Sequence, residues 1–253
     1  MTVGQDNAIA TPASGAEPKP NSFQRIIGVL FSPDATFASI ARRPDFVVPL
    51  VLLLVVSLAA GVIMAPHIDF GAAAREAMEQ NKNATPEQID KAVRISASIG
   101  KVFTYISPVL SLIGLLVIAG IVLLAFRIFG GEGDFKQAFS VTCYSSIPTI
   151  IKSVVTLIII VAKGGIIPAQ ALATLVRSNL GFLVDYKANP VAFALLSSFD
   201  IFSFWFLALL IIGFSYVARV SKTKAAVTII SLWILTLLLK LIGPAIQSLR
   251  ATK

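Results

Sequence analysis

The stretch Gly130–Lys163, GGEGDFKQAFSVTCYSSIPTIIKSVVTLIIIVAK, decides the fold class of this chain. It opens with a polar turn rich in glycine. The aromatic residues Phe135 and Phe139 follow at the start of the apolar segment. Pro148 then stands inside a helical pattern, and the stretch closes with an aliphatic run from Leu157 to Val161. A helix that is apolar on nearly every side belongs either to a deep core or to a membrane. The composition of the whole chain selects between the two.

The composition favours a membrane protein. Of the 253 residues, 56% are hydrophobic and 13% are charged, whereas a soluble domain has about 25% charged residues. A soluble fold of this length would lack the polar residues to cover its surface, while several crossings of about 20 apolar residues fit easily. The net charge of +8 is typical of cations retained beside spans. No basic cluster interleaved with aromatic residues appears, so we expect anionic lipid rather than nucleic acid as the partner.

The apolar runs predict an all-α integral membrane protein. Residues 1–20 read as a disordered tail, and residues 46–248 as a membrane domain. Five transmembrane helices are expected in that domain, at about 46–65, 102–126, 138–162, 190–218 and 225–248. Arg42 and Arg43 flank the first span directly, so the rule that cations stay inside predicts a cytoplasmic N-terminus.

Residues 21–45 predict an amphipathic interfacial segment made of two short helices. Ser32 and Pro33 form a good helix start, with a hydroxyl cap followed by proline. One interpretation places this segment in the membrane interface, with its arginines on anionic lipid. The other packs it against the ends of the bundle, and the sequence leaves both open. The expected lipid-surface contacts are Arg25, Arg42 and Arg43.

Three charges stand well inside the apolar runs: Lys152, Asp200 and Lys240. Each lies about 13–15 Å below the same face of the membrane, the outer one, at 1.5 Å per residue, so they could form one intramembrane polar cluster. Such charges are costly in a membrane and often mark a functional site. The plainer interpretation is an Asp–Lys pair that fixes which helices adjoin, or lysines whose charges reach an interface.

Nothing in the sequence points to an enzyme. It has no phosphate-binding glycine loop, no HExxH and no nucleophile elbow, and only Asp200 supplies an intramembrane carboxylate. With one cysteine, Cys143, and one histidine, His67, a His/Cys zinc site is not expected. We read Cys143 as a small buried apolar residue and His67 as an interfacial one, and we expect no metal or cofactor.

Three blocks of sequence stand out along the chain: FSPDATFASIARRPDFVVPL at 31–50, GGEGDFKQAFSVTCYSSIPTII at 130–151 and DIFSFWFLALLIIGFSYVARVSKTKA at 200–225. Together they resemble the Yip-domain family of membrane proteins, in its bacterial form. Their order and spacing agree with the family over about residues 22–240. The positions that match its motifs include Tyr144, Pro148 and Trp205.

The resemblance implies a protein of about five spans with a cytoplasmic N-terminus, which for a bacterial member means the inner membrane. Eukaryotic relatives bind prenylated Rab GTPases, but this chain lacks the aromatic-glycine-proline signature expected before the first span. We therefore expect a non-enzymatic scaffold that recruits partners or organises the membrane. Membrane or cytoplasmic protein partners and a homo-oligomer are compatible with that role. The alternative is a small transporter or channel-like protein that uses Lys152, Asp200 and Lys240.

Overall fold

The computed structural model describes residues 21–251, apart from residues 80 and 82 and the side chains of 247, 250 and 251. The tail predicted at 1–20 lies outside the described residues. The described chain is helical except for its turns and a single pair of two-residue parallel strands, β1 (Ile68–Asp69) and β2 (Ile167–Pro168). The helices are α1 Ser22–Phe31, α2 Pro33–Arg42, α3 Val47–Met64, α4 Ala72–Glu79, α5 Pro86–Tyr105, α6 Ser107–Ile128, α7 Phe135–Ser145, α8 Ile147–Lys163, α9 Leu172–Leu175, α10 Pro190–Leu196, α11 Ile201–Val217 and α12 Lys222–Ala251, with short 3-10 turns η1 Ala65–His67, η2 Ala169–Ala171 and η3 Leu180–Leu183.

Four helical segments of the described chain are long and apolar enough to cross a membrane. Their mean hydropathy lies between 2.0 and 3.0. Most of their surface is not covered by protein; on α3, for example, the outward-facing Val47, Val51 and Val55 are all more than half exposed. Such faces need lipid, so the fold is that of an all-α membrane protein. The four segments are Val47–His67, Ser107–Ile128, Phe135–Lys163 and Lys222–Ile246.

The structure differs from the prediction for residues 190–218. Instead of one continuous span, this segment forms two helices, α10 and α11. At Asp200 the backbone turns extended (φ −118°, ψ 133°). The Ile201 N–H donates to the carbonyl of Ser178 instead of continuing the helix. What remains unbroken is α11, whose 17 residues span about 25 Å.

Two other expected spans also contain a break. Ser146 separates α7 from α8, with Pro148 in the first turn of α8. Proline has no N–H, but an N–H in the first turn would have no acceptor within the helix, so no hydrogen bond is lost there. Ile106 separates α5 from α6, and Pro108 stands at the start of α6 in the same way. The predicted span at 102–126 therefore begins on the last turn of α5, and the one at 138–162 begins on α7.

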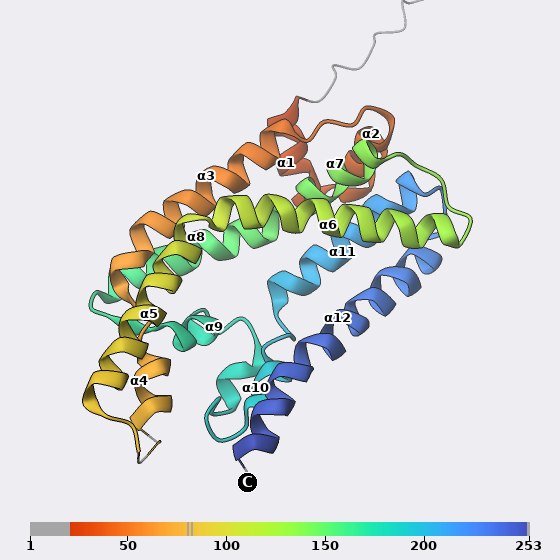
Figure 1. Cartoon of the computed structure of the whole chain (residues 1–253). Helices are drawn as coiled ribbons and strands as arrows, with labels where there is room; N and C mark the ends of the chain where they lie inside the picture. Colours follow the sequence, from red (N-terminus) through yellow and green to blue (C-terminus); the bar gives the residue numbers. More distant parts are fainter. Residues whose placement is uncertain (1–20, 80, 82, 252–253) are drawn as a thin grey trace, which may run out of the picture.

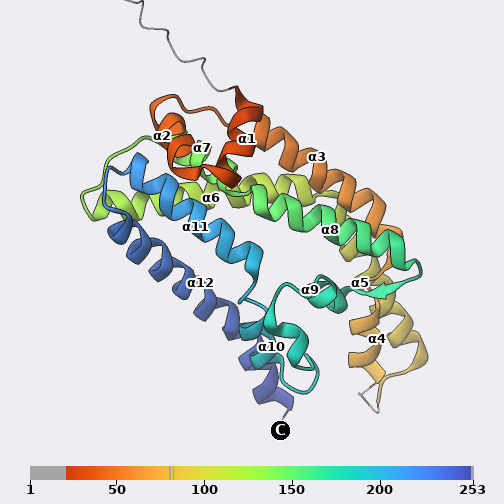
Figure 2. The ribbon, with the colours of Figure 1, turned by 180° about the vertical axis from the view of Figure 1, so that it is seen from behind.

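A cluster of buried aromatic side chains lies where α2, α6, α7 and α11 meet. Phe37, Phe126, Tyr144 and Phe214 are all fully buried there, and the rings of Phe126 and Phe214 stack with centroids 5.5 Å apart. Figures 1 and 2 show that α1, α2 and α7 gather at one end of the bundle, together with the end of α11 and the start of α12. The opposite end carries α4, α9, α10 and the C-terminus (Figure 1).

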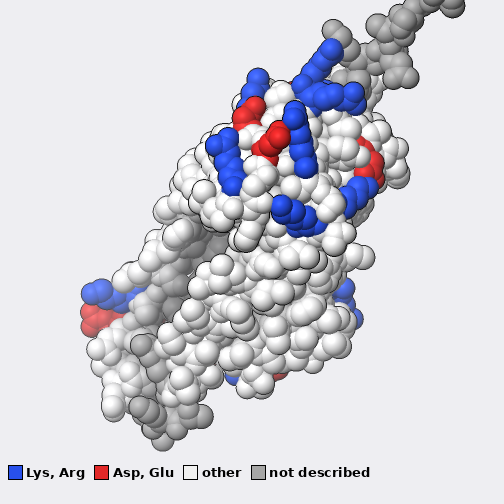
Figure 3. All heavy atoms as spheres, turned by 90° about the vertical axis from the view of Figure 1, so that its right-hand side faces the viewer, with Lys and Arg blue, Asp and Glu red and all other residues white. Residues whose placement is uncertain are grey.

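Charged side chains are concentrated on that first end, which we call the charged end. In Figure 3 they cluster over it, and a broad band of the same face beneath them is nearly free of charge. An uncharged band bounded by a charged end is the surface that a bilayer requires. The cations carried by its helix ends and turns are Arg42, Arg43, Arg127, Lys136, Arg219, Lys222 and Lys224.

Candidate functional site

The break between α10 and α11 brings an acid and two lysines from three helices to one place, which we call the polar junction (Lys152, Ser198, Asp200, Ser203 and Lys240). Lys152 reaches it from α8 and donates to Asp200 Oδ2 with an Nζ–Oδ2 distance of 2.6 Å. The Ser203 hydroxyl donates to the same carboxylate oxygen at 3.2 Å. The junction therefore contains the Asp–Lys pair that the sequence suggested.

Lys240 reaches the junction from α12 but does not join this pair. Its Nζ donates to Ser198 Oγ at 2.9 Å, and no carboxylate of the described residues lies within ion-pairing distance of it. Lys240, Lys152 and Asp200 nevertheless line one open pocket of about 260 Å³, with Trp233 and Thr236 at its side. The expected cluster is assembled, with one cation left outside the ion pair.

The three charges lie at similar depths. Lys152 is 17 positions after Phe135, Asp200 is 17 before Val217, and Lys240 is 18 after Lys222, counting from the helix termini at the charged end. At 1.5 Å per residue, Asp200 and Lys240 are about 25–27 Å from that end along α11 and α12, and Lys152, beyond the break at Ser146, is held at the depth of Asp200 by their ion pair. The polar junction thus lies near the far side of a hydrocarbon core of about 30 Å.

Asp200 is the most enclosed member of the junction, with 2% of its surface exposed. Its second oxygen, Oδ1, has no hydrogen bond within the described residues, and the hydroxyl of the neighbouring Ser178 is likewise buried and unpaired. A small rotation of that hydroxyl would pair the two groups. Asn179 forms an isolated backbone bridge with Asp200, so the loop before α10 holds the backbone of Asp200 in place.

At the charged end, Arg25 joins the two N-terminal helices from within. It is 7% exposed and donates to the Arg43 carbonyl at 3.0 Å and to Ser39 Oγ at 3.1 Å. The expectation that Arg25 contacts the lipid surface is therefore corrected, because its guanidinium finds acceptors on and after α2. Arg42 and Arg43 have exposed side chains.

Asp34 attaches α2 to the last two helices. Its carboxylate accepts from the Lys222 ammonium and, at 3.0 Å, from the Tyr216 hydroxyl. The hydrogen bond from Lys222, joined by that from Tyr216, holds the pKa of the Asp34 carboxyl below its usual value, against a smaller opposing effect of burial. The α6–α7 turn is attached nearby, since Glu132 pairs with Arg219 at 2.8 Å.

The three positions that match family motifs have structural settings. Tyr144 is fully buried, and its hydroxyl donates to Asp45 Oδ2 at 3.4 Å, an oxygen that the Ser22 hydroxyl also approaches. Pro148 is buried at the start of α8. Trp205 lies on α11 five positions after Asp200 and is 37% exposed. These three residues form no common site in the way that the polar junction does.

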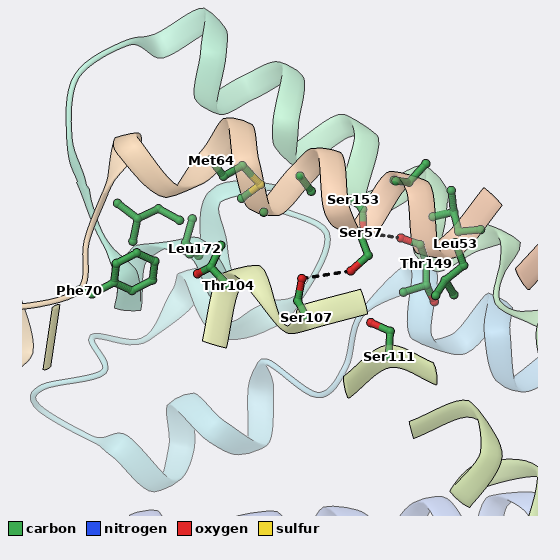
Figure 4. Close-up of a pocket in the computed structure, with 15 residues that line it drawn as sticks. Leu53, Ser57, Met64, Phe70, Thr104, Ser107, Ser111, Thr149, Ser153 and Leu172 are labelled. Atoms are coloured by element: carbon green, nitrogen blue, oxygen red, sulfur yellow. Dashed lines mark hydrogen bonds between the residues drawn. The ribbon is translucent and has the colours of Figure 1, made fainter. Parts of the chain in front are cut away.

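Sequence reasoning missed a second cavity, which Figure 4 shows between α3, α6 and α8. It has a volume of about 310 Å³. Ser57 of α3 and Ser107 of α6 share a hydrogen bond of 3.2 Å across it, and Thr149 and Ser153 of α8 lie at its wall. The only signal in the sequence was hydroxyl side chains inside apolar runs, which occur in most membrane helices.

The remaining candidates have simple surroundings. Cys143 is buried, and His67 Nδ1 lies 3.0 Å from the carbonyl of Ile63 one turn earlier. Among residues 21–251, without the two undescribed positions, no group of three or more His, Cys, Asp or Glu side chains is placed to hold a metal ion.

Comparisons with known proteins identify the family. The Yip1 domain matches residues 27–242, which include α2, the break at Ser146, the polar junction and most of α12. Comparisons with curated proteins and with solved structures give no match. The match covers most of the chain, and the chain therefore belongs to the Yip1 domain family of membrane proteins.

Proposed function

We propose that this protein is a non-enzymatic membrane organiser that gathers anionic lipid, and through it partner proteins, at its charged end. The observation that carries the proposal is a stripe of apolar side chains on α1. Phe23, Ile27 and Phe31 are 71%, 58% and 80% exposed. Residues four apart lie on one face of a helix, so α1 presents a continuous apolar edge.

The opposite face of α1 is firmly held. Val29 is fully buried, and the hydrogen bonds of Arg25 fix α1 to α2, which in turn packs on α7 and α11. A helix that is anchored on one side and apolar on the other is suited to lie in a membrane interface. The exposed Arg42 and Arg43 nearby would attract the headgroups of anionic lipids.

The proposal includes an orientation. The short turns that carry cations, Arg127–Lys136 and Arg219–Lys224, both lie at the charged end, and such turns stay in the cytoplasm. The N-terminus would then be cytoplasmic and the C-terminus outside, with α10 and α11 together making a fifth crossing. For the bacterial-type member that the sequence resembles, the membrane is the inner one.

The test uses the full chain in liposomes of phosphatidylcholine with a minor fraction of fluorescent phosphatidylglycerol. Gathering of this lipid around the protein quenches its fluorescence. The wild type should quench it, and a Phe23→Ser/Ile27→Ser/Phe31→Ser variant should not. Val51→Ser/Val55→Ser on the outward face of α3 serves as the control, since it removes apolar surface elsewhere. Equal quenching by the α1 variant and the wild type would refute the proposal.

A second candidate, a small transporter, is favoured by the broken helix at Asp200. Interrupted helices with an ionisable group at the break form the sites of many transporters. Proton flux into liposomes that hold a pH-sensitive dye would test it. A proton-coupled transporter predicts flux that Asp200→Asn abolishes in protein that still folds; flux equal to that of empty liposomes would refute proton transport through the junction.

A further inference from the structure

We propose that Lys240 and Ser198 form a binding site for a phosphate group, which a lipid headgroup or dissolved phosphate would supply. The site is at the polar junction, about 27 Å along α12 from the charged end. It is separate from the α1 stripe, so it stands or falls independently of the organiser function.

The polar junction contains one more positive charge than negative charge, because two lysines share it with one aspartate. Asp200 is already engaged by Lys152 at 2.6 Å and by the Ser203 hydroxyl. It also precedes the first turn of α11, where a helix favours negative charge. Lys240 therefore faces a carboxylate whose charge is satisfied by another lysine, and the pocket as a whole carries one net positive charge.

The hydrogen-bonding capacity of Lys240 is also unfilled. An ammonium has three donors, and the described residues supply one acceptor, Ser198 Oγ at 2.9 Å. The Ser198 hydroxyl gives its own proton to the Ala194 carbonyl at 2.9 Å, which turns a lone pair of its oxygen to Lys240. Two N–H bonds of Lys240 remain for a ligand, and lysine is a common phosphate-binding residue.

The pocket suits a phosphate group better than a single small ion. It offers about 260 Å³, and Lys152 lines it together with Lys240. A phosphate carries several acceptor oxygens, so one group can accept from both ammonium ions, whereas one halide ion would fill little of the space.

The position of Lys240 gives a lipid access to the site. A distance of about 27 Å from the charged end places it near the edge of a hydrocarbon core of about 30 Å, close to the headgroups of the opposite leaflet. Its neighbours on α12, Leu238, Leu239 and Ile242, are 57%, 57% and 52% exposed, so the outer surface of this helix faces acyl chains.

The experiment measures the thermal unfolding of the full chain in an uncharged detergent, as each of three compounds is titrated. Dioctanoyl-phosphatidylglycerol tests a lipid phosphate, dioctanoylglycerol has the same chains without phosphate, and sodium phosphate at fixed ionic strength tests the dissolved anion. Each apparent affinity follows from the shift of the unfolding midpoint, because a ligand that binds only the folded protein stabilises it. Lys240→Met and Lys240→Arg are the test variants. Lys91→Met, on an exposed position of α5 outside both the charged end and the polar junction, is the matched control.

We expect phosphatidylglycerol to stabilise the wild type and dioctanoylglycerol to have no effect. Lys240→Met should weaken the response at least about tenfold, the loss typical of a hydrogen bond to a charged group. Lys240→Arg and Lys91→Met should retain it. A response to sodium phosphate with the same dependence on Lys240 would also support the site and would show that free phosphate can fill it.

Two results would overturn the proposal: an equal response of Lys240→Met and the wild type to both phosphate compounds, or an equal response to dioctanoylglycerol and phosphatidylglycerol. If Lys240→Met does not fold, Ser198→Ala replaces it, since this change removes the hydroxyl that accepts from Lys240 and leaves every charge in place. It should weaken binding by about two- to tenfold, and unchanged binding would again count against the site.

Discussion

The charged end and the polar junction contain the same kinds of side chain but use them differently. At the charged end, Asp34 is matched by Lys222 and Tyr216, and Glu132 by Arg219. At the polar junction, Lys152 and Lys240 share a pocket with one carboxylate, and only Lys152 pairs with it. The charges described at the charged end form ion pairs that join helices. At the polar junction, one ion pair joins α8 to the start of α11, and the charge of Lys240 is left over.

The surroundings of each set of charges determine how much it contributes to the stability of the fold. Ion pairs in contact with water contribute little to stability, so the charged end depends on buried aromatic side chains such as Phe37. Inside a bilayer a charge is costly unless it is paired, so the polar junction depends on Lys152 and Asp200 remaining together. Four substitutions test this difference between the two ends.

Phe37→Ala should destabilise the protein most. Phe37 is fully buried between α2 and its neighbours, and truncating a buried phenylalanine costs about 3–5 kcal/mol. Phe31→Ala is the matched control, because Phe31 is 80% exposed and should change the unfolding free energy in detergent by less than about 0.5 kcal/mol. Similar losses in the two variants would mean that α2 does not pack as described.

Asp200→Asn should have the second-largest effect on stability. It leaves the Lys152 ammonium without its partner, and breaking a buried pair costs about 3–5 kcal/mol. The loss should fall at or below the lower end of that range because the Lys152 side chain is 31% exposed. Asp90→Asn on α5, where the side chain is exposed, should leave the unfolding midpoint unchanged. A midpoint for Asp200→Asn as high as that of the control would contradict a structural Lys152–Asp200 pair.

Lys240→Met should have a smaller effect of the opposite sign. It removes an ammonium with no carboxylate partner, so in ligand-free detergent the protein should be as stable as wild type or more stable by about 1 kcal/mol, less than the cost of a charge at a bilayer centre. The measurement is again the unfolding midpoint. A loss comparable to that of Asp200→Asn would place Lys240 in the same structural role as Lys152.

The smallest effect concerns pH at the charged end. The pKa of Asp34 is lower in the folded protein than its usual value, so its contribution is complete above the unfolded pKa of about 3.9 and is lost as the pH falls through the lowered value. The difference in unfolding midpoint between wild type and Asp34→Asn should therefore be constant from pH 7 to pH 5 and shrink below pH 4. A difference that grows as the pH falls would have the wrong sign.

Much of this contrast could be read from the sequence, for identifiable reasons. The apolar runs predicted the membrane fold because a span needs length and hydropathy, which are local properties. The depths of Lys152 and Asp200 predicted their meeting because helices have a fixed rise per residue. Ser32 and Pro33 predicted where the second of two short N-terminal helices begins; the structure contains both helices, although the Ser32 side chain makes no capping hydrogen bond.

The features that could not be predicted from the sequence depend on contacts between residues that are distant along the chain. The break before α11 exists because the Ile201 N–H finds the Ser178 carbonyl, which no periodicity reveals. Arg25 is buried because its acceptors are Ser39 and the Arg43 carbonyl, although it resembles the surface arginines that follow. The hydroxyl-lined cavity arises only when Ser57 meets Ser107 between helices.

A pair of double-mutant cycles on unfolding free energy, one for Lys152 with Asp200 and one for Lys240 with Asp200, tests directly whether Lys240 is an unpaired cation. Lys152→Met, Lys240→Met, Asp200→Asn and the two double variants would be unfolded in the same ligand-free detergent. We predict a coupling of about 1–3 kcal/mol for Lys152 with Asp200 and less than about 0.5 kcal/mol for Lys240 with Asp200. Equal coupling of both lysines to Asp200 would contradict the claim, because Lys240 would then be a structural partner rather than the unpaired cation of a binding site.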